Sequence, residues 1–218
     1  MLSISRSQKV FKGIDYFGNF LGEPIKIGNI YKCDSKSFIL LAHITDLMPE
    51  ISLTSITTRS KSPDLTYTKQ SHVSVKAGGK ATSGVGRGEL QLDFKKKNSA
   101  FVALKDVTIT QLKMELILEQ LRLLWKSKRF STNGTHLIVN QVLAAKSGTV
   151  IFSQDRNNKV VLKAKGDELL SSALHAASGN VEFVINTKAT LEIISKTTIL
   201  PMFKGVYLDR RGRVQVAK

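Results

Sequence analysis

Thirteen residues near the end of the sequence, Val181–Ile193, alternate between two kinds of side chain. The odd-numbered positions are mostly apolar: Val181, Phe183, Ile185, Thr187, Ala189, Leu191 and Ile193. The even-numbered positions are polar, namely Glu182, Asn186, Lys188, Thr190 and Glu192, except that Val184 breaks the alternation. The pattern predicts one two-faced strand, against a usual strand of about 5–6 residues. Such a strand spans roughly 44 Å, or about 31 Å when tilted near 45°, and would cross a hydrocarbon core of about 30 Å. The alternation fits two kinds of strand: one in the wall of a membrane β-barrel, or a long strand in the sheet of a soluble protein.

A second two-faced region lies earlier in the chain. Val73, Val75 and Ala77 alternate with polar residues, and so do Leu90, Leu92 and Phe94. The stretch between them is rich in glycine, so the region predicts a long β-hairpin. Gly84, Gly86 and Gly88 precede a strand rather than a helix, which excludes both common nucleotide-phosphate loops.

The remaining pattern predicts an α+β fold, a twisted and mostly antiparallel sheet with packed helices, in a single domain over residues 1–218. We expect helices at 3–12, 108–128 and 166–177, and a strand over 37–48 that ends in a helical turn before Pro49. We expect strands at 25–31, 99–107, 137–145, 149–163 and 199–208, with a turn at 155–158. Residues 51–65 read as a polar connecting segment and 209–218 as a short basic tail.

The net charge of +16, from 33 Lys+Arg against 17 Asp+Glu, indicates an anionic partner. Basic residues gather at Lys95–Lys97, at the C-terminus, on the first predicted helix (Arg6, Lys9 and Lys12) and at the end of the long one (Lys126, Lys128 and Arg129). Acidic phospholipid and nucleic acid are the two candidates. With aromatic residues at 7% and no RNA- or DNA-binding motif, no nucleic acid is expected, and a basic nucleic-acid-binding module remains the alternative function.

Enzyme chemistry and cofactors are not expected from this sequence. His43, His72, His136 and His175 lie far apart, without metal-ligand spacing, and no nucleophile or metalloprotease motif occurs. The single cysteine, Cys33, excludes an internal disulfide and suits a reducing compartment. We expect neither a secretory signal nor a transmembrane helix.

The order of these elements, together with several local patterns, resembles the pore-forming domain of the gasdermins. The patterns are Leu21–Pro24, Ile44–Pro49, Phe94–Lys97, Leu104–Val107, Thr135–Leu143, Ser178–Val181 and Ile199–Leu208. The likeness is to the short microbial and fungal type that lacks a large C-terminal repressor domain. It implies a protein that is cytoplasmic when inactive, binds acidic phospholipid at the cell membrane, and assembles into a homo-oligomeric β-barrel pore that kills the cell in immune or allorecognition defence.

The resemblance also assigns residues. Arg6, Lys9 and Lys12 match the basic first helix that touches lipid headgroups, and Lys126, Lys128 and Arg129 are further lipid-binding candidates. Residues 71–104 and 149–194 match the two membrane hairpin regions. Their membrane-inserting candidates are Val73, Val75, Leu90, Leu92, Phe94, Val181, Phe183, Ile185, Leu191 and Ile193. Only residues 209–218 follow the closing strand, which disfavours activation by cleavage and makes a second gasdermin-like protein a candidate trigger. Cys33 is not at the family's lipidated position.

Overall fold

A computed structural model describes residues 16–18, 25–33, 38–68, 73–77, 89–97, 99–127, 135–153, 156–164, 181–186, 190–195, 198–208 and 213–216. The chain divides into two compact units. Unit 1 comprises Met1–Ser60, Thr108–Ala144 and Leu200–Lys218, and unit 2 comprises Lys61–Val107 and Ala145–Ile199. The predicted helices at 3–12 and 166–177 and the glycine-rich stretch 78–88 lie outside the described residues.

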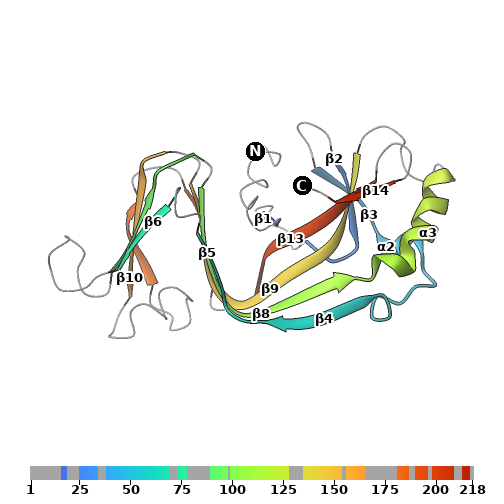
Figure 1. Cartoon of the computed structure of the whole chain (residues 1–218), viewed down its shortest axis with the longest axis horizontal. Helices are drawn as coiled ribbons and strands as arrows, with labels where there is room; N and C mark the ends of the chain where they lie inside the picture. Colours follow the sequence, from blue (N-terminus) through green and yellow to red (C-terminus); the bar gives the residue numbers. More distant parts are fainter. Residues whose placement is uncertain are drawn as a thin grey trace. The chain divides into compact units, whose positions relative to one another are not determined.

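The described part of unit 1 combines strands with two helices (Figure 1). Strands β1, β13, β9, β2 and β3 are hydrogen-bonded in that order, while β14 pairs with β13 and β4 with β8. The bounds of these strands are β1 Phe17–Gly18, β2 Asn29–Cys33, β3 Phe38–His43, β4 Thr57–Ser62, β8 Ser99–Leu112, β9 Thr135–Ser153, β13 Ile199–Leu208 and β14 Val214–Val216, and the helices are α2 Ile44–Leu47 and α3 Met114–Lys126. Strands β4, β8, β9 and β13 each have residues in both units.

Two apolar clusters lie on opposite faces of the unit 1 sheet. Ile30 packs in a cluster with Ile117, Leu121 and Trp125 of α3. Its neighbour Tyr31 belongs to a second cluster with Ile25, Leu137, Val139, Val142 and Phe203. Because successive side chains of a strand point to opposite faces, β2 divides the two clusters. The helix contributes residues at steps of four, which is the spacing of one helical face.

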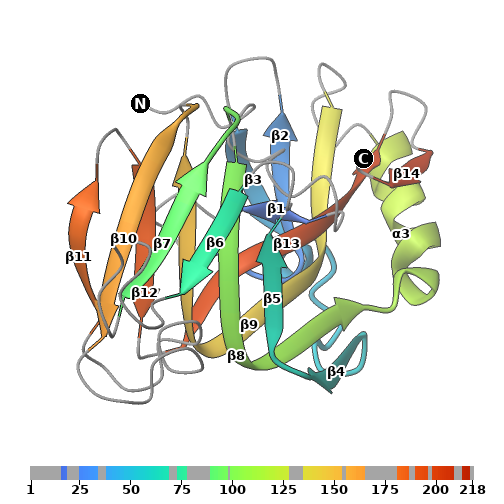
Figure 2. The same cartoon turned by 60° about the vertical axis from the view of Figure 1, so that its left-hand side comes forward.

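In unit 2, a four-stranded sheet has the order β11–β10–β7–β6 (Figure 2). These strands are β6 Val73–Ala77, β7 Glu89–Phe94, β10 Asn158–Ala164 and β11 Val181–Asn186. Strands β5 (Leu65–Thr68) and β12 (Thr190–Ser195) pair instead with β8 and β9. Every pairing whose register the structure defines is antiparallel. The mostly antiparallel, sheet-rich α+β fold is therefore present.

Several predicted elements are confirmed. Strands β6 and β7 pair as the predicted hairpin, with Val73 opposite Phe94 and Ala77 opposite Leu90. Strand β3 leads into the helical turn α2 before Pro49, and β13 covers the predicted closing strand. The turn near Asn157 is also present, and its φ of 57° lies in the left-handed region that asparagine tolerates.

The prediction of one strand over 181–193 is wrong. The structure has two strands in different sheets, β11 on β10 and β12 on β9. Within β11 the register shifts, so Phe183 lies opposite Leu162 and Ile185 opposite its neighbour Val161. An extra residue in one strand changes which face later residues occupy. Val184, where the alternation breaks, marks this shift.

Three boundaries also differ from the prediction. The long helix begins at Met114 rather than Thr108, because the β-branched residues before it extend β8 to Leu112. Residues 57–62, predicted as connection, form strand β4, whose threonine and serine residues show no apolar alternation. Strand β5 begins at Leu65, the last residue of the predicted connection. Strand β2 begins at Asn29 rather than Ile25, after a turn in which Gly28 has a φ of 84°.

The predicted break between strands near residues 146–148 is absent, because β9 is continuous from Thr135 to Ser153. Gly148 serves close packing rather than a turn. A Cβ atom there would lie 2.5 Å from Leu104 Cδ2 and 2.9 Å from the Ala103 carbonyl oxygen. Strand β14 was also missed, and it lies inside the segment predicted as a basic tail.

Candidate functional site

The strongest candidate site is the four-stranded sheet of unit 2, because it joins the two predicted hairpin regions. Strand β7 from the first region pairs with β10 from the second, with Leu92 opposite Val160 and Leu90 opposite Leu162. Strands β6 and β11 extend the sheet on its two sides. Strands β7 and β10 are separated by more than sixty residues of sequence, and their pairing places both regions in one sheet (Figure 2).

On one face of this sheet, the described side chains of β7 and β10 are apolar and fully covered. Leu92, Phe94, Val160 and Leu162 have no solvent exposure, and they pack with Phe101, Ala103 and Ile151 of β8 and β9. Between the two apolar residues of β7, Asp93 is half-buried and its Oδ1 accepts a 2.7 Å hydrogen bond from Gln91 Nε2. Strand β7 therefore has an apolar face and a polar face, as the sequence alternation predicted.

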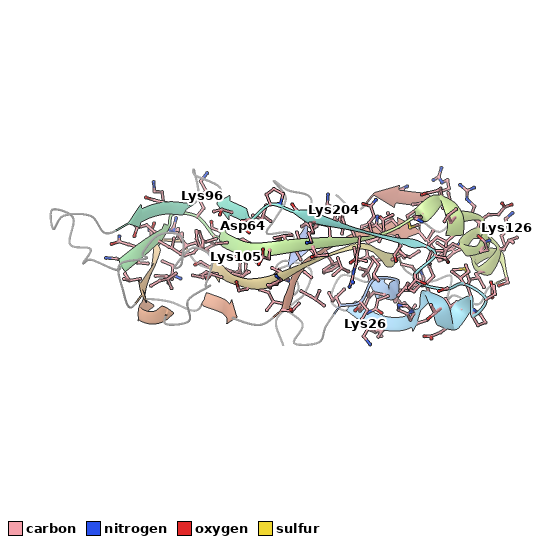
Figure 3. All side chains as sticks on the ribbon, turned by 90° about the horizontal axis from the view of Figure 1, so that it is seen from below. Lys26, Asp64, Lys96, Lys105, Lys126 and Lys204 are labelled. Carbon is pink, nitrogen blue, oxygen red and sulfur yellow. The ribbon has the colours of Figure 1, made fainter. Side chains whose placement is uncertain are left out.

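Cations gather at one end of this sheet. Lys95, Lys96 and Lys97 follow β7 directly and are exposed, and Ser99 Oγ donates a 2.8 Å hydrogen bond to the Lys96 carbonyl oxygen. Register places Asn158 opposite Phe94, so the turn with the exposed Arg156 lies at the same end. Figure 3 shows the Lys96 side chain extending from the ribbon. The arrangement can attract an anionic surface over a short range.

The structure describes the predicted site residues to three different extents. For the first group it places the side chain: Leu92 and Phe94 are buried in the apolar face, and Lys126 is exposed in the last turn of α3 (Figure 3). Val73, Val75, Leu90, Val181, Phe183 and Ile185 lie on strands of the four-stranded sheet, whereas Leu191 and Ile193 lie on β12 opposite Phe152 and Val150. Arg6, Lys9, Lys12, Lys128 and Arg129 lie outside the described residues.

The two described histidines, His43 and His136, take part in helix capping and core packing. His43 Nδ1 accepts from the backbone N–H of Thr45 and Nε2 contacts the Ile27 carbonyl oxygen at 2.7 Å, so the ring caps α2. His136 is fully buried, and its ring meets Trp125 edge-on at a centroid distance of 4.9 Å. Burial and the nearby Lys32 lower the pKa of His136, which keeps it neutral. Among the described residues, no three His, Cys, Asp or Glu side chains could together hold a metal ion.

The sequence pattern did not reveal which cations share the end of the sheet. Lys95–Lys97 is visible as a run in the sequence, but Arg156 joins it only through the register of β7 with β10. Within the described residues, no helix is long and apolar enough to cross a bilayer. No protein-family model matches this chain, and a search of curated proteins finds no match either.

Proposed function

We propose that this chain is a pore-forming protein that acts as the gasdermins do. It binds membranes that contain acidic phospholipid, assembles there with further copies of itself, and inserts strands of unit 2 as the wall of a β-barrel. The protein moves from the cytoplasm to the cell membrane when it becomes active. It has no enzymatic activity in this proposal. The observation that carries the proposal is the pairing of β7 with β10, which joins the two hairpin regions into one sheet with an apolar face.

The chemistry of a bilayer explains why such a sheet suits insertion. A membrane-spanning strand must satisfy every backbone N–H and C=O with neighbouring strands, since hydrocarbon offers no partners. It must also present apolar side chains to lipid and polar ones to the lumen. Leu92, Phe94 and Val160 supply the first kind, and the hydrogen-bonded Gln91 and Asp93 supply the second.

The cations at the end of the sheet support recognition of an acidic membrane. A lysine near an anionic surface contributes about 1 kcal/mol of attraction, and salt screens this attraction. Three neighbouring lysines, Lys95–Lys97, give a reversible attachment that apolar insertion would then stabilise.

Release of a trapped dye from vesicles tests the function. We expect leakage from vesicles that contain acidic phospholipid and little leakage from neutral ones, with ring-shaped oligomers visible on the leaky vesicles. If the chain alone causes no leakage, a second gasdermin-like protein is added to the assay as the trigger. Acidic vesicles that stay intact both with and without this added protein contradict the proposal. If the chain then binds DNA or RNA in a salt-sensitive way, the nucleic-acid-binding alternative is favoured.

Charge reversal separates the basic end of the sheet from the overall charge. We expect the triple substitution Lys95→Glu, Lys96→Glu and Lys97→Glu to lower leakage about tenfold or more at physiological salt. The matched control reverses Lys61, Arg122 and Lys146, which are exposed cations elsewhere in the chain. Equal losses in both triple variants would show that net charge alone matters.

A further inference from the structure

Unit 1 contains an open groove with a volume of about 1340 Å³, separate from the sheet proposed for insertion. All of its lining residues belong to unit 1. They come from β2 and the turn before it, from β3 and α2, from 53–59, and from single positions on β8, β9 and β13. Typical small-molecule sites occupy about 300–1,000 Å³, so the groove can hold an extended ligand.

A bulge in β3 gives the groove much of its apolar surface. Ile30 pairs with Ala42 and Tyr31 with Leu40, which leaves Leu41 as an extra residue in β3. Leu40 and Leu41 both line the groove, although consecutive residues of a regular strand point to opposite faces. A bulge redirects side chains in this way. The two leucines remain 51% and 42% exposed, an unusual state for adjacent large apolar residues.

Polar groups in the floor are already engaged by other groups of the protein. Asn29 Nδ2 donates to the Tyr31 hydroxyl at 3.0 Å, and the His43 ring contacts the Ile27 carbonyl oxygen and Thr45. The Thr57 hydroxyl donates to the Leu53 carbonyl oxygen at 2.8 Å. The floor therefore offers few hydrogen bonds to a peptide, whose backbone N–H and C=O groups each need a partner. It offers apolar contact instead.

The charged residues of the lining favour an anion. Lys26 and Arg59 are exposed, and neither forms an ion pair with another described residue. The lining carboxylate, Asp46, accepts a 3.0 Å hydrogen bond from the backbone N–H of His43 as part of the α2 cap. An apolar floor beside two cations complements a ligand with one hydrocarbon chain and one negative head group.

We propose that this groove binds a single-chain lipid anion, of which a long-chain fatty acid is the simplest. The hydrocarbon chain lies along Leu40 and Leu41, and the carboxylate is held at Lys26 or Arg59. This binding takes place in solution and is independent of pore formation, so it can fail while vesicle leakage persists, and the reverse also holds.

Titration calorimetry with sodium dodecanoate, kept below its micelle threshold, tests the proposal on the full chain. We expect saturable binding of one molecule per chain. Butanoate, which has the head group without the chain, and a neutral dodecyl sugar, which has the chain without the charge, should each bind at least about tenfold more weakly. Equal affinity for dodecanoate and the neutral dodecyl sugar would overturn the claim that the groove selects an anion. The absence of any dodecanoate binding would overturn the proposal as a whole.

Matched variants locate the site. We expect the double variant Leu40→Ser and Leu41→Ser to weaken dodecanoate binding about tenfold, whereas Leu116→Ser and Leu123→Ser, which change exposed leucines of α3, leave it unchanged. Lys26→Glu or Arg59→Glu should weaken it severalfold, and the control Arg122→Glu, at an exposed cation of α3, should not. Circular dichroism checks each fold.

Nuclear magnetic resonance of the unmodified protein provides a test that needs no variant. Dodecanoate should shift the methyl signals of Leu40 and Leu41 but not those of Leu116 and Leu123. Shifts confined to the α3 leucines, or spread evenly over both pairs, would show adventitious adsorption to a cationic protein and overturn the proposal.

Discussion

Units 1 and 2 bury their apolar residues in different ways. Unit 1 has clusters on both faces of its sheet, and one of them is completed by α3. Local hydrogen bonds fix its turns, such as the bond from the Asn29 backbone N–H to the Lys26 carbonyl oxygen at 3.1 Å. The described cluster of unit 2 is made only by strands β7, β8, β9 and β10.

This difference teaches which part of the chain can change its structure. Strand hydrogen bonds can be remade with new strand neighbours, whereas a helix cap such as His43 on α2 depends on one local arrangement. Unit 2 also buries polar groups, including Asn158, whose Nδ2 donates to Ser153 Oγ at 3.0 Å. Moving such groups into a wetter setting costs less than exposing an apolar core. In the proposed pore, unit 2 rearranges and unit 1 keeps its fold.

The largest expected effect comes from the apolar face of unit 2. Phe94 is fully buried, so Phe94→Ala should lower the free energy of unfolding by about 3–5 kcal/mol, through lost burial and the cavity left behind. Chemical denaturation followed by circular dichroism measures it. The exposed neighbour provides the control, because Lys96→Ala should change stability by no more than about 0.5 kcal/mol.

The same variant shows whether the two units unfold independently. Trp125, the only tryptophan of the chain, lies in unit 1 and reports on its core. If unit 2 unfolds by itself, Phe94→Ala moves the circular-dichroism transition and leaves Trp125 fluorescence at its original midpoint. A joint shift of both signals would mean one cooperative fold and would contradict a selective rearrangement of unit 2.

The strands of unit 2 were easier to predict than their partners. Alternation in Val73–Ala77 and Leu90–Phe94 predicts the hairpin correctly, and in β7 it reflects the covered face formed by Leu92 and Phe94. Alternation over 181–193 predicts strand but misses the division into β11 and β12, since a periodic pattern does not say which strand is the neighbour. The pairing of β7 with β10, on which the candidate site depends, is a contact between distant segments and leaves no local signal.

In unit 1, local signals set some boundaries and tertiary contacts set others. Pro49 and the His43 cap limit α2, and the spacing of Ile117, Leu121 and Trp125 reveals α3. The groove could not be predicted, because it depends on the bulge at Leu41 and on Arg59 of a strand whose exposed residues resemble a loop. The break predicted between 145 and 149 was wrong as well, since Gly148 lies inside β9 and meets a packing requirement.

A second pair of substitutions compares how tightly the two units pack. A Cβ at Gly205 of unit 1 would lie 2.4 Å from Leu137 Cδ1, and one at Gly148 of unit 2 would lie 2.9 Å from the Ala103 carbonyl oxygen. We expect each change to alanine to cost about 1–3 kcal/mol of stability, as overpacking does. Gly148→Ala should cost more, because the Ala103 carbonyl oxygen lies closer to its Cβ than the Ile138 carbonyl oxygen, at 3.1 Å, lies to a Cβ at Gly205. Thermal unfolding of both variants checks the order, and a neutral Gly148→Ala would show that β8 and β9 separate easily.

The smallest expected effect is a pH dependence confined to unit 1. The pKa of His136 lies below its ordinary value of 6.5, mainly because burial disfavours the charged ring. The positive charge of Lys32, which lies directly opposite His136 on β2, lowers the pKa further. The unfolded chain therefore binds a proton more readily, so stability is complete above about pH 6.5 and falls as the pH drops through the lowered pKa. Each pKa unit corresponds to only about 1.4 kcal/mol, so unit 1 should loosen rather than unfold at mildly acidic pH.

Denaturation midpoints between pH 7.5 and 5, followed by Trp125 fluorescence, measure this dependence because the indole packs against the His136 ring. His136→Phe keeps an aromatic ring beside Trp125 and cannot bind a proton, so it should remove the acid-induced loss. Lys32→Gln should reduce the loss while leaving part of it, because burial is the larger cause. An unchanged midpoint for the unmodified protein across this range would mean that unit 1 accommodates a charged ring at His136, and that its core is less rigid than its packing indicates.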